Sequence, residues 1–261
     1  MSGAQHPDWI VPAWNASARV RAFVTTRAGG TSAGPYGAPA GGGLNLGLST
    51  GDDPERVRAN RERLRAALPA PPRWLRQVHG AAVVDAVTVD VPVEADAAFT
   101  SAADVVCIVS IADCLPVLLA DDRARCVAVA HAGWRGLAAG VIQASVAAMR
   151  ARIADPQARI HAWLGPAIGP GRFEVGADVL DAMRATLPRA RDAFAPIAGG
   201  KFLADLPALA RQALEQVGVV GAGGGTLCTY SDPARFYSFR RDRITGRHAA
   251  VIWLARSENV A

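Results

Sequence analysis

Hydrophobic residues in this chain gather in short runs that are separated by glycine-rich or charged segments. The runs with the length of strands are rich in β-branched residues and predict strands at residues 21–26, 105–111, 116–120, 126–130, 160–164 and 249–254. Those between residues 105 and 130 show no polar alternation and are separated by turns that contain aspartate, as in strands buried on both faces. Residues 74–78 and 82–87 predict further short strands on either side of His79 and Gly80.

Helices are predicted where apolar residues recur every few positions, in residues 53–68, 137–149, 175–187 and 203–217. The first of these has a capping residue in Asp52 or Asp53 and a proline, Pro54, in its first turn. Neither an internal repeat nor a linker divides the chain. The pattern therefore predicts one α/β domain over residues 1–261, with mixed sheets covered by helices and a loosely ordered start at residues 1–15.

Composition narrows the class of protein. The chain has 261 residues, of which 51% are hydrophobic, so it can bury a large core. Its first residues lack the basic and apolar regions of a secretory signal, and its longest apolar run, residues 105–120, is interrupted by Asp113 and Pro116 and is too short to span a bilayer. These features predict a cytoplasmic protein without a membrane partner.

The net charge of +5 suits anionic ligands such as phosphate, but it does not by itself indicate nucleic acid.

Candidate chemistry centres on His79, Cys114 and His131, which lie at the boundaries of predicted strands beside glycine, proline or alanine. Each residue type is a good zinc ligand, and two imidazoles with one thiolate would leave one position of a tetrahedral zinc open, as in catalytic sites. Their spacing matches no short metal-binding motif, so the three would have to converge from separate segments. A single histidine is more often a surface or core residue than a ligand. The case for a metal therefore rests on the three occurring together.

Two alternatives remain open on the residues alone. Two histidines and a cysteine also describe a blue-copper site, but such a site usually adds an axial methionine, and no methionine lies near these segments in sequence. The chain's 5 histidines are also too few for a multicopper oxidase, so zinc is favoured over copper. A metal-free hydrolase would instead use Cys114 as its nucleophile and His131 or His79 as its base.

Polar residues beside these segments are candidates for other roles. Asp113 precedes the cysteine and could orient a ligand, transfer a proton or cap a turn. Arg135 lies at a predicted helix start, where free backbone amides could hold an anion. Arg27 and Asn45 lie in loops that follow apolar stretches and are candidate substrate contacts.

Arginines interleave with aromatic residues near the end of the chain, in CTYSDPARFYSFRRDRITGR from residue 228 to residue 247. Such a segment could stack bases and bind phosphate, with Arg240 as a candidate substrate contact, or it could form a hairpin with a solvated charged face. A non-catalytic RNA-binding module is the corresponding alternative function. It predicts salt-sensitive RNA binding that survives the loss of His79 and His131.

Ordered motifs cover nearly the whole chain, from about residue 25 to residue 254: VTTRAGG, LNLGLSTGDDPERVRANRERL, WLRQVHG, DA-AFT, ADCLPVLL, VAVAHAGWRGLAAGV, AWLGPAIGP and FYSFRRD. Together they resemble the YfiH-type laccase-domain family. The resemblance implies zinc bound by His79, Cys114 and His131, and an α/β/β/α arrangement of mixed sheets like that of CNF/YfiH-like cysteine hydrolases. The alanine- and glycine-rich residues 34–43 look like an insertion that could alter access to the site.

The resemblance also implies an activity. Members of the family act as purine nucleoside phosphorylases on adenosine, inosine, guanosine and methylthioadenosine, with adenosine deaminase activity beside this. The partners expected are therefore purine nucleosides and phosphate, for a chain that acts as a monomer or weak homo-oligomer. Zinc would polarise a water or a substrate oxygen, Asp113 could carry a proton, and Arg27, Arg135 or Arg240 could balance the charge of phosphate. The alternative within the family is a cysteine- or zinc-dependent hydrolase that edits peptidoglycan precursors.

Overall fold

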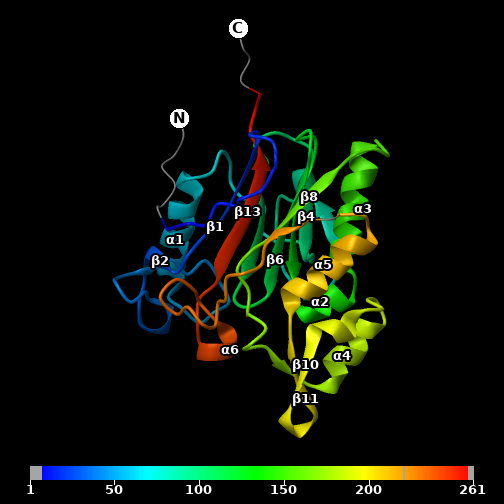
Figure 1. Cartoon of the computed structure of the whole chain (residues 1–261). Helices are drawn as coiled ribbons and strands as arrows, with labels where there is room; N and C mark the ends of the chain where they lie inside the picture. Colours follow the sequence, from blue (N-terminus) through cyan, green and yellow to red (C-terminus); the bar gives the residue numbers. More distant parts are fainter. Residues whose placement is uncertain (1–7, 220, 258–261) are drawn as a thin grey trace.

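Two β-sheets lie face to face between two layers of helix in the computed structural model, which describes residues 8–219 and 221–257 (Figure 1). The larger sheet has the strand order β12-β8-β6-β7-β4-β3, and the smaller one has the order β1-β13-β5. In the larger sheet the outer pairs β12–β8 and β3–β4 are parallel, and the inner pairs are antiparallel. The predicted α/β/β/α fold with mixed sheets is confirmed.

The strands are β1 (Val20–Val24), β2 (Ala28–Ser32), β3 (Val83–Asp85), β4 (Ala97–Thr100), β5 (Cys107–Ile111), β6 (Leu115–Asp121), β7 (Val127–Ala132), β8 (Ile160–Leu164), β9 (Glu174–Val175), β10 (Phe194–Ile197), β11 (Lys201–Ala204), β12 (Gly223–Gly224) and β13 (His248–Leu254). The α-helices are α1 (Pro54–Ala66), α2 (Trp134–Ala138), α3 (Val141–Ile153), α4 (Ala177–Arg184), α5 (Leu206–Gln216) and α6 (Phe239–Asp242). Short 3-10 helices cover Gly34–Tyr36, Ala86–Thr88, Ala190–Ala193 and Ala198–Gly200.

The core has three layers because successive residues of a strand point to opposite faces of its sheet. In β6, Val117 and Leu119 pack beneath helices α2 to α5, whereas Leu118 and Ala120 pack against the smaller sheet. The outer face of the smaller sheet packs against α1, through side chains such as Leu64. The central strand β6 is buried along its whole length, as its uninterrupted apolar run predicts.

Helix α1 forms as its sequence predicts. The side chain of Asp53 accepts a hydrogen bond from the backbone N–H of Glu55 at 2.9 Å, and Pro54 occupies the first turn. Val57 and Leu64 bury the apolar face of the helix against the smaller sheet.

Two predicted helices are divided by the structure. The segment predicted as a helix at residues 137–149 is two helices, α2 and α3, because Gly140 adopts a left-handed φ of 85° between them. The segment predicted at residues 203–217 begins as strand β11, and helix α5 starts only after Asp205, whose side chain accepts the N–H of Ala208.

The remaining differences concern short or irregular segments. Residues 74–78 form no regular strand and make one isolated bridge, between Arg76 and Glu94. The strand predicted at 82–87 shortens to β3. The helix predicted at 175–187 shortens to α4, after β9, which joins β10 and β11 in a small third sheet. The arginine-rich tail is not a hairpin but a series of turns with the short helix α6.

Residues 1–7 of the start that was predicted to be loosely ordered lie outside the described residues. Further along this segment, Trp9 is buried with its ring stacked on Phe23 at a centroid distance of 4.5 Å, and Ile10 pairs with Val24.

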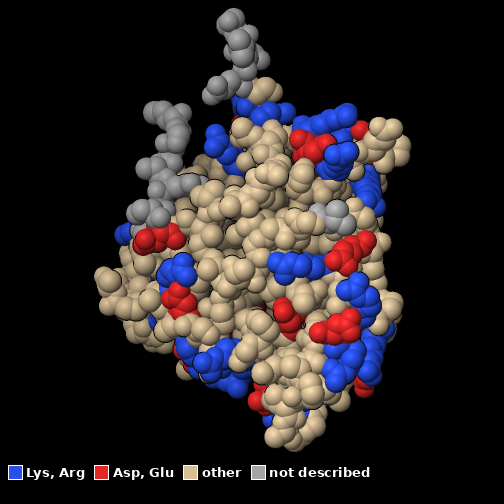
Figure 2. Space-filling view, in the orientation of Figure 1, with Lys and Arg blue, Asp and Glu red and all other residues tan. Residues whose placement is uncertain are grey.

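Among the described residues, no helix has the length and apolar character needed to cross a bilayer. Lysine and arginine side chains are interspersed with aspartate and glutamate over the face of the molecule shown in Figure 2.

Candidate metal centre

The structure brings together the three candidate ligands from three separate segments. His131 lies near the end of β7, Cys114 lies in the turn between β5 and β6, and His79 lies in the loop that precedes β3. Their ligand atoms all lie within 4.8 Å of one another, so small side-chain rotations would allow all three to bind one ion. His131 is buried, Cys114 is partly buried and His79 is exposed. A cluster of this kind could bind a metal ion and leave its outer side accessible to a substrate.

A buried carboxylate, Asp96, holds the two histidine segments in place. Its Oδ1 lies 2.8 Å from Nδ1 of His131. The same carboxylate accepts hydrogen bonds from the backbone N–H groups of Val78, His79 and Gly80, at 3.0, 3.0 and 2.7 Å. Because Nδ1 of His131 is occupied, Nε2 is the ring nitrogen left to bind a metal. Burial alone would raise the pKa of Asp96, but the hydrogen bonds from His131 and the backbone lower it below its usual value.

Cys114 and His131 form an electrostatic pair. Burial by itself would raise the pKa of the Cys114 thiol, yet the two neighbouring imidazoles lower it. Burial would likewise lower the pKa of His131, whereas the Cys114 sulfur and Asp96 raise it. The pair therefore favours a thiolate beside an imidazolium, and the thiolate is the form of cysteine that binds metals and acts as a nucleophile.

Unusual backbone conformations occur at two positions of this site. His79 has a φ of 61° and Asp113 a φ of 90°, a region that residues other than glycine rarely adopt. The hydrogen bonds to Asp96 fix the first of these positions. Gln77 adds a second anchor, because its side-chain amide pairs with both the N–H and the carbonyl of Ser110 on β5, at 2.7 and 2.9 Å.

Gly133 allows the close packing that the cluster requires. A Cβ atom added at this position would lie 2.7 Å from Sγ of Cys114 and 3.4 Å from Cδ2 of His79. Any other residue would therefore press on the sulfur of Cys114 and contact the ring of His79. The close approach of Gly133 to Cys114, and not only its position at the start of α2, therefore explains the first glycine in HAGWRG.

Asp113, the expected proton carrier, uses both carboxylate oxygens within the protein. Oδ1 accepts the hydroxyl of Thr229 at 2.6 Å, and Oδ2 accepts the backbone N–H of Arg240 at 2.7 Å. Its own carbonyl accepts the N–H of Ile168 at 2.9 Å. Asp113 therefore ties the cysteine turn to two other loops.

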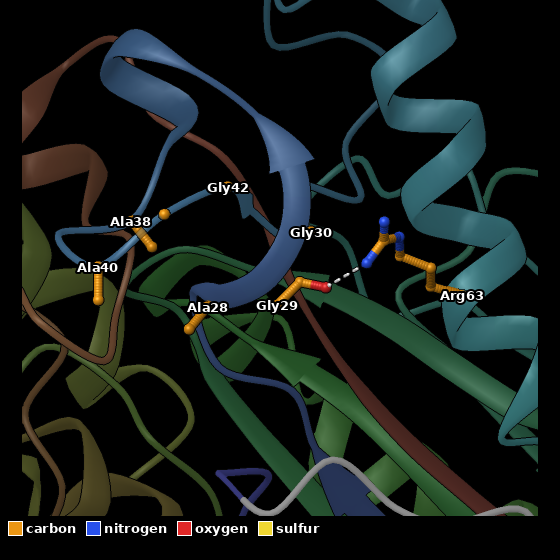
Figure 3. A pocket seen from close by; sticks show the side chains of 8 residues that line it. Ala28, Gly29, Gly30, Ala38, Ala40, Gly42 and Arg63 are labelled. Atoms are coloured by element: carbon orange, nitrogen blue, oxygen red, sulfur yellow. Dashed lines mark hydrogen bonds between the residues drawn. The ribbon is translucent and has the colours of Figure 1, made fainter.

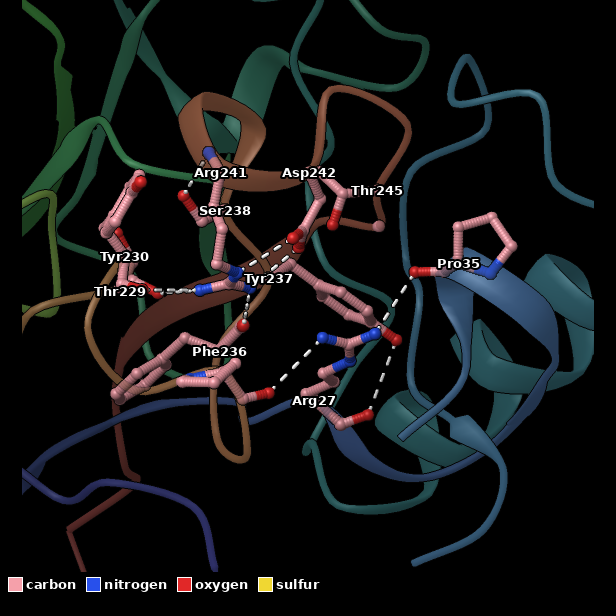
Figure 4. Close-up of polar contacts among 12 residues, drawn as sticks. Arg27, Pro35, Thr229, Tyr230, Phe236, Tyr237, Ser238, Arg241, Asp242 and Thr245 are labelled. Atoms are coloured by element: carbon pink, nitrogen blue, oxygen red, sulfur yellow. Dashed lines mark hydrogen bonds and ion pairs between the residues drawn. The ribbon is translucent and has the colours of Figure 1, made fainter. Parts of the chain in front are cut away.

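Arg27 and Asn45, the expected substrate contacts, are both committed to internal hydrogen bonds. The guanidinium of Arg27 donates to the carbonyls of Gly37, Pro35 and Pro233 at 2.5 to 3.3 Å, and it lies between these loops in Figure 4. Asn45 is fully buried and contacts the residues Gly47, Thr50, Asp52 and Arg247. Both side chains hold loops together.

The other two candidate contacts lie beside the cluster. Arg240 is linked to Asp113 through its backbone, but its side chain turns away and donates to the carbonyl of Glu174 at 2.8 Å. Arg135 is exposed on α2, with its guanidinium carbon 4.2 Å from the centroid of the Trp134 ring.

Sequence reasoning did not single out Asp96 or Thr229. Asp96 begins the DA-AFT motif, where an aspartate directly before an apolar strand was a usable signal of a buried acidic group. Thr229 lies in CTY, over a hundred positions from Asp113 in sequence, and nothing in its local pattern reveals this contact.

A pocket of about 300 Å³ shares no residue with the cluster. Glycine and alanine residues of strand β2 and of the loop at residues 38–42 line it. Its one charged side chain, Arg63, donates to the carbonyl of Gly29 at 3.2 Å (Figure 3). It contains neither a metal ligand nor a nucleophile, so the candidate chemistry lies at the histidine–cysteine cluster.

The fold and the site define a class of α/β/β/α proteins whose histidine–cysteine cluster is built from the end of a strand and two neighbouring loops. Residues 21–255 match the model of the family described as multi-copper polyphenol oxidoreductase laccase, and the chain belongs to this family. The predicted membership of the laccase-domain family is confirmed.

The family is described as an oxidoreductase, but two similar proteins are named as purine nucleoside phosphorylases. The chain is 49% identical over 247 residues to purine nucleoside phosphorylase PA4543 of Pseudomonas aeruginosa, covering 94% of this chain and 98% of that protein. It is 47% identical over 248 residues to purine nucleoside phosphorylase YfiH of Escherichia coli, with the same coverage of 94% and 98%. The crystal structure of the Neisseria meningitidis protein NMB0706 matches it with a TM-score of 0.89 and 46% identity, over 95% of this chain and 100% of that one.

Proposed function

We propose that this protein is a zinc-dependent purine nucleoside phosphorylase that cleaves adenosine, inosine, guanosine and methylthioadenosine with phosphate. The open cluster of His79, Cys114 and His131 carries the proposal, because it is a metal-binding group with one accessible side. The names of relatives that are up to 49% identical support the choice of nucleosides and phosphate as substrates. We place the activity in the cytoplasm and propose a monomer or weak homo-oligomer.

The donor set fits zinc better than copper, despite the name of the family. Two imidazoles and one thiolate suit a catalytic zinc with a free position. A blue-copper site would add an axial methionine, but Met149 and Met183 are fully buried in the packing of α3 and α4. With 5 histidines, the chain also cannot supply the imidazoles of several copper centres.

His79, Cys114 and His131 would hold the ion, which supplies Lewis-acid polarisation of a substrate oxygen or a water when bound. Asp96 keeps the His131 imidazole in the orientation that presents Nε2 to the cluster. Asp113 acts as a positioning residue, because both of its oxygens hold other loops next to the cysteine turn. In phosphorolysis, a phosphate oxygen forms a bond to the anomeric carbon of the ribose, and the bond from that carbon to the purine nitrogen breaks.

Adenosine deamination is proposed as a second activity of the same site. Water would replace the amino group on the purine ring and release ammonia, so this reaction needs no phosphate. The two activities are therefore separable by the dependence of their products on phosphate.

A metal-free cysteine hydrolase that edits peptidoglycan precursors is the second candidate. One feature favours it: the neighbouring imidazoles lower the pKa of the Cys114 thiol, which is how a cysteine nucleophile is activated. The same shift equally prepares the thiolate for a metal. The hydrolase predicts full activity after the metal is removed, and the phosphorylase predicts none.

The contacts of Arg241, in the arginine-rich tail, do not favour an RNA-binding module. Arg241 forms a two-point ion pair with Asp242 and donates to the carbonyls of Thr229, Tyr230 and Phe236 (Figure 4). This guanidinium is therefore occupied inside the protein rather than presented to a phosphate backbone.

Purified protein incubated with adenosine, with and without phosphate, tests the proposal. Adenine and ribose 1-phosphate that appear only with phosphate show phosphorolysis, and inosine shows deamination. Metal analysis should find one zinc per chain in the wild type and little in Cys114→Ala, which should also be inactive. Absence of both products from zinc-loaded protein would refute the proposal, and hydrolysis that survives chelation would support the cysteine hydrolase.

A further inference from the structure

Arg247 lies directly before β13, and its backbone is fixed on both sides. Its N–H donates to Oδ1 of Asn45 at 2.9 Å, and its carbonyl accepts the N–H of Leu46 at 3.1 Å. The aliphatic part of the side chain lies against Gly47, where an added Cβ would come within 2.7 Å of Cγ of Arg247. The position of this side chain is therefore built into the loops around it.

The guanidinium of Arg247 retains donors for a ligand. Nη1 donates to the carbonyls of Thr245 and Gly246 at 3.1 and 3.0 Å. In residues 8–219 and 221–257, its Nε and Nη2 have no hydrogen-bond partner, and no carboxylate forms an ion pair with it. These two nitrogens form one edge of the planar guanidinium, which is the edge that binds two oxygens of a phosphate at once.

Contacts of the neighbouring segment place the guanidinium of Arg247 close to the turn that carries Cys114. Burial lowers the pKa of this half-buried guanidinium, while the negative charges of Cys114 and Asp113 raise it. The guanidinium carbon also lies 5.8 Å from the centroid of the Phe239 ring, which is 47% exposed. Phe239 is followed by Arg240, whose backbone N–H donates to Oδ2 of Asp113 at 2.7 Å, and Asp113 directly precedes Cys114.

Three other arginines of the surrounding segments lack these properties. Arg27 donates from all three of its nitrogens to backbone carbonyls, and Arg241 is paired with Asp242. The side chain of Arg240 contacts the carbonyl of Glu174.

We propose that Arg247 binds the attacking phosphate at this centre through Nε and Nη2, an assignment that rests on the proposed phosphorolysis. Phosphate carries its charge on oxygens that a guanidinium fork matches in geometry. A cation at this place would hold the anion near the candidate metal centre and balance its charge. This makes Arg247, rather than Arg27 or Arg240, the main phosphate contact of the chain.

Calorimetric titration of zinc-loaded protein with inorganic phosphate tests the assignment without depending on turnover. Arg247→Met should weaken phosphate binding at least about tenfold, and Arg247→Lys should weaken it less because it keeps the charge but loses the fork. Arg243→Met is the matched control, because Arg243 flanks the same Phe239 ring at 6.0 Å, and it should bind phosphate like the wild type. In kinetic assays, Arg247→Met should raise the KM for phosphate and leave the KM for the nucleoside and the zinc content unchanged.

The outcomes separate this assignment from the proposed function. A wild-type protein that does not bind phosphate, or an Arg247→Met protein that binds it equally well, overturns the assignment. Phosphate binding that is lost in Arg247→Met, in a protein that forms no ribose 1-phosphate, supports the anion site and refutes the phosphorylase. If Arg247→Met does not fold, the comparison of Arg247→Lys with Arg243→Met decides, and equal affinities for phosphate would overturn the assignment.

Discussion

Nδ1 of His131 lies 2.8 Å from Oδ1 of Asp96, a carboxylate with no exposed surface. The same group accepts the N–H groups of residues 78–80, so one side chain fixes both the buried imidazole and the loop that carries His79. The arrangement of two candidate metal ligands therefore depends on a residue that is not itself in the cluster.

Asp96→Asn should weaken metal binding. Asparagine cannot accept all of these hydrogen bonds and lacks the charge that makes His131 a better ligand, so a loss of about 10- to 100-fold in zinc affinity is expected. Competition with a zinc-binding dye measures the affinity directly. Asp121→Asn is the control, because Asp121 is also fully buried and is paired with Arg125 at 2.8 Å. It should lower stability and leave the zinc affinity unchanged, and equal losses in both variants would contradict the role of Asp96.

Gly133→Ala should disturb the cluster while the fold is retained. The new Cβ would lie 2.7 Å from Sγ of Cys114, so the sulfur or the α2 start must move. We expect zinc content and activity to fall by at least about tenfold, since displaced ligands bind zinc poorly. Gly171→Ala is the matched control, because a Cβ there meets nothing within 4 Å. Normal zinc content in Gly133→Ala would show that the site accommodates the extra methyl group.

The sequence predicts the strands of this fold well where it contains an uninterrupted apolar run. The apolar runs that became β5, β6, β7 and β13 lie within two residues of their predicted bounds, because strands buried on both faces need uninterrupted apolar sequence. Prediction fails where one residue changes the backbone. Gly140 divides a continuous apolar helix pattern into α2 and α3, and the pattern of apolar positions does not contain that information.

The residues of the candidate site were likewise predicted only in part. Residue type and position at strand boundaries were enough to select His79, Cys114 and His131. Arg27 and Asn45 were chosen only for being polar and in loops, and the structure shows that their side chains form hydrogen bonds that hold those loops together. Contacts across the chain, such as Asp113 with Thr229, depend on the tertiary fold and leave no local pattern.

Asp113→Asn distinguishes a positioning residue from a proton carrier. The amide can accept only one of the two hydrogen bonds that Asp113 now accepts from Thr229 and Arg240, so kcat/KM should fall by roughly tenfold. The shape of the pH–rate profile should stay the same, because no proton donor is lost. Thr229→Val removes only the hydroxyl contact and should lower kcat/KM in the same direction. Loss of one limb of the pH profile in Asp113→Asn would instead identify Asp113 as a proton carrier.

His248 should make the protein less stable in acid. It is fully buried, its Nε2 accepts the N–H of Tyr237 at 2.7 Å, and burial lowers its pKa to about 3. An unfolded histidine has a pKa of about 6.5, so between these values the unfolded chain binds a proton that the folded chain does not. The free energy of unfolding should therefore fall as the pH drops below about 6.5, by about 3 kcal/mol at about pH 4.5.

Urea denaturation of metal-free protein at about pH 7 and about pH 4.5 measures this contribution of His248, because removing the metal keeps acid release of an ion out of the comparison. His248→Gln places an oxygen near the Nε2 position and cannot titrate. It should be less stable than the wild type at about pH 7 but should lose less stability on acidification, by about 3 kcal/mol. His131, whose pKa shift has the opposite sign, is present in both proteins and cancels in this difference. Equal losses of stability in the two proteins would show that His248 is already protonated in the folded state or titrates normally there.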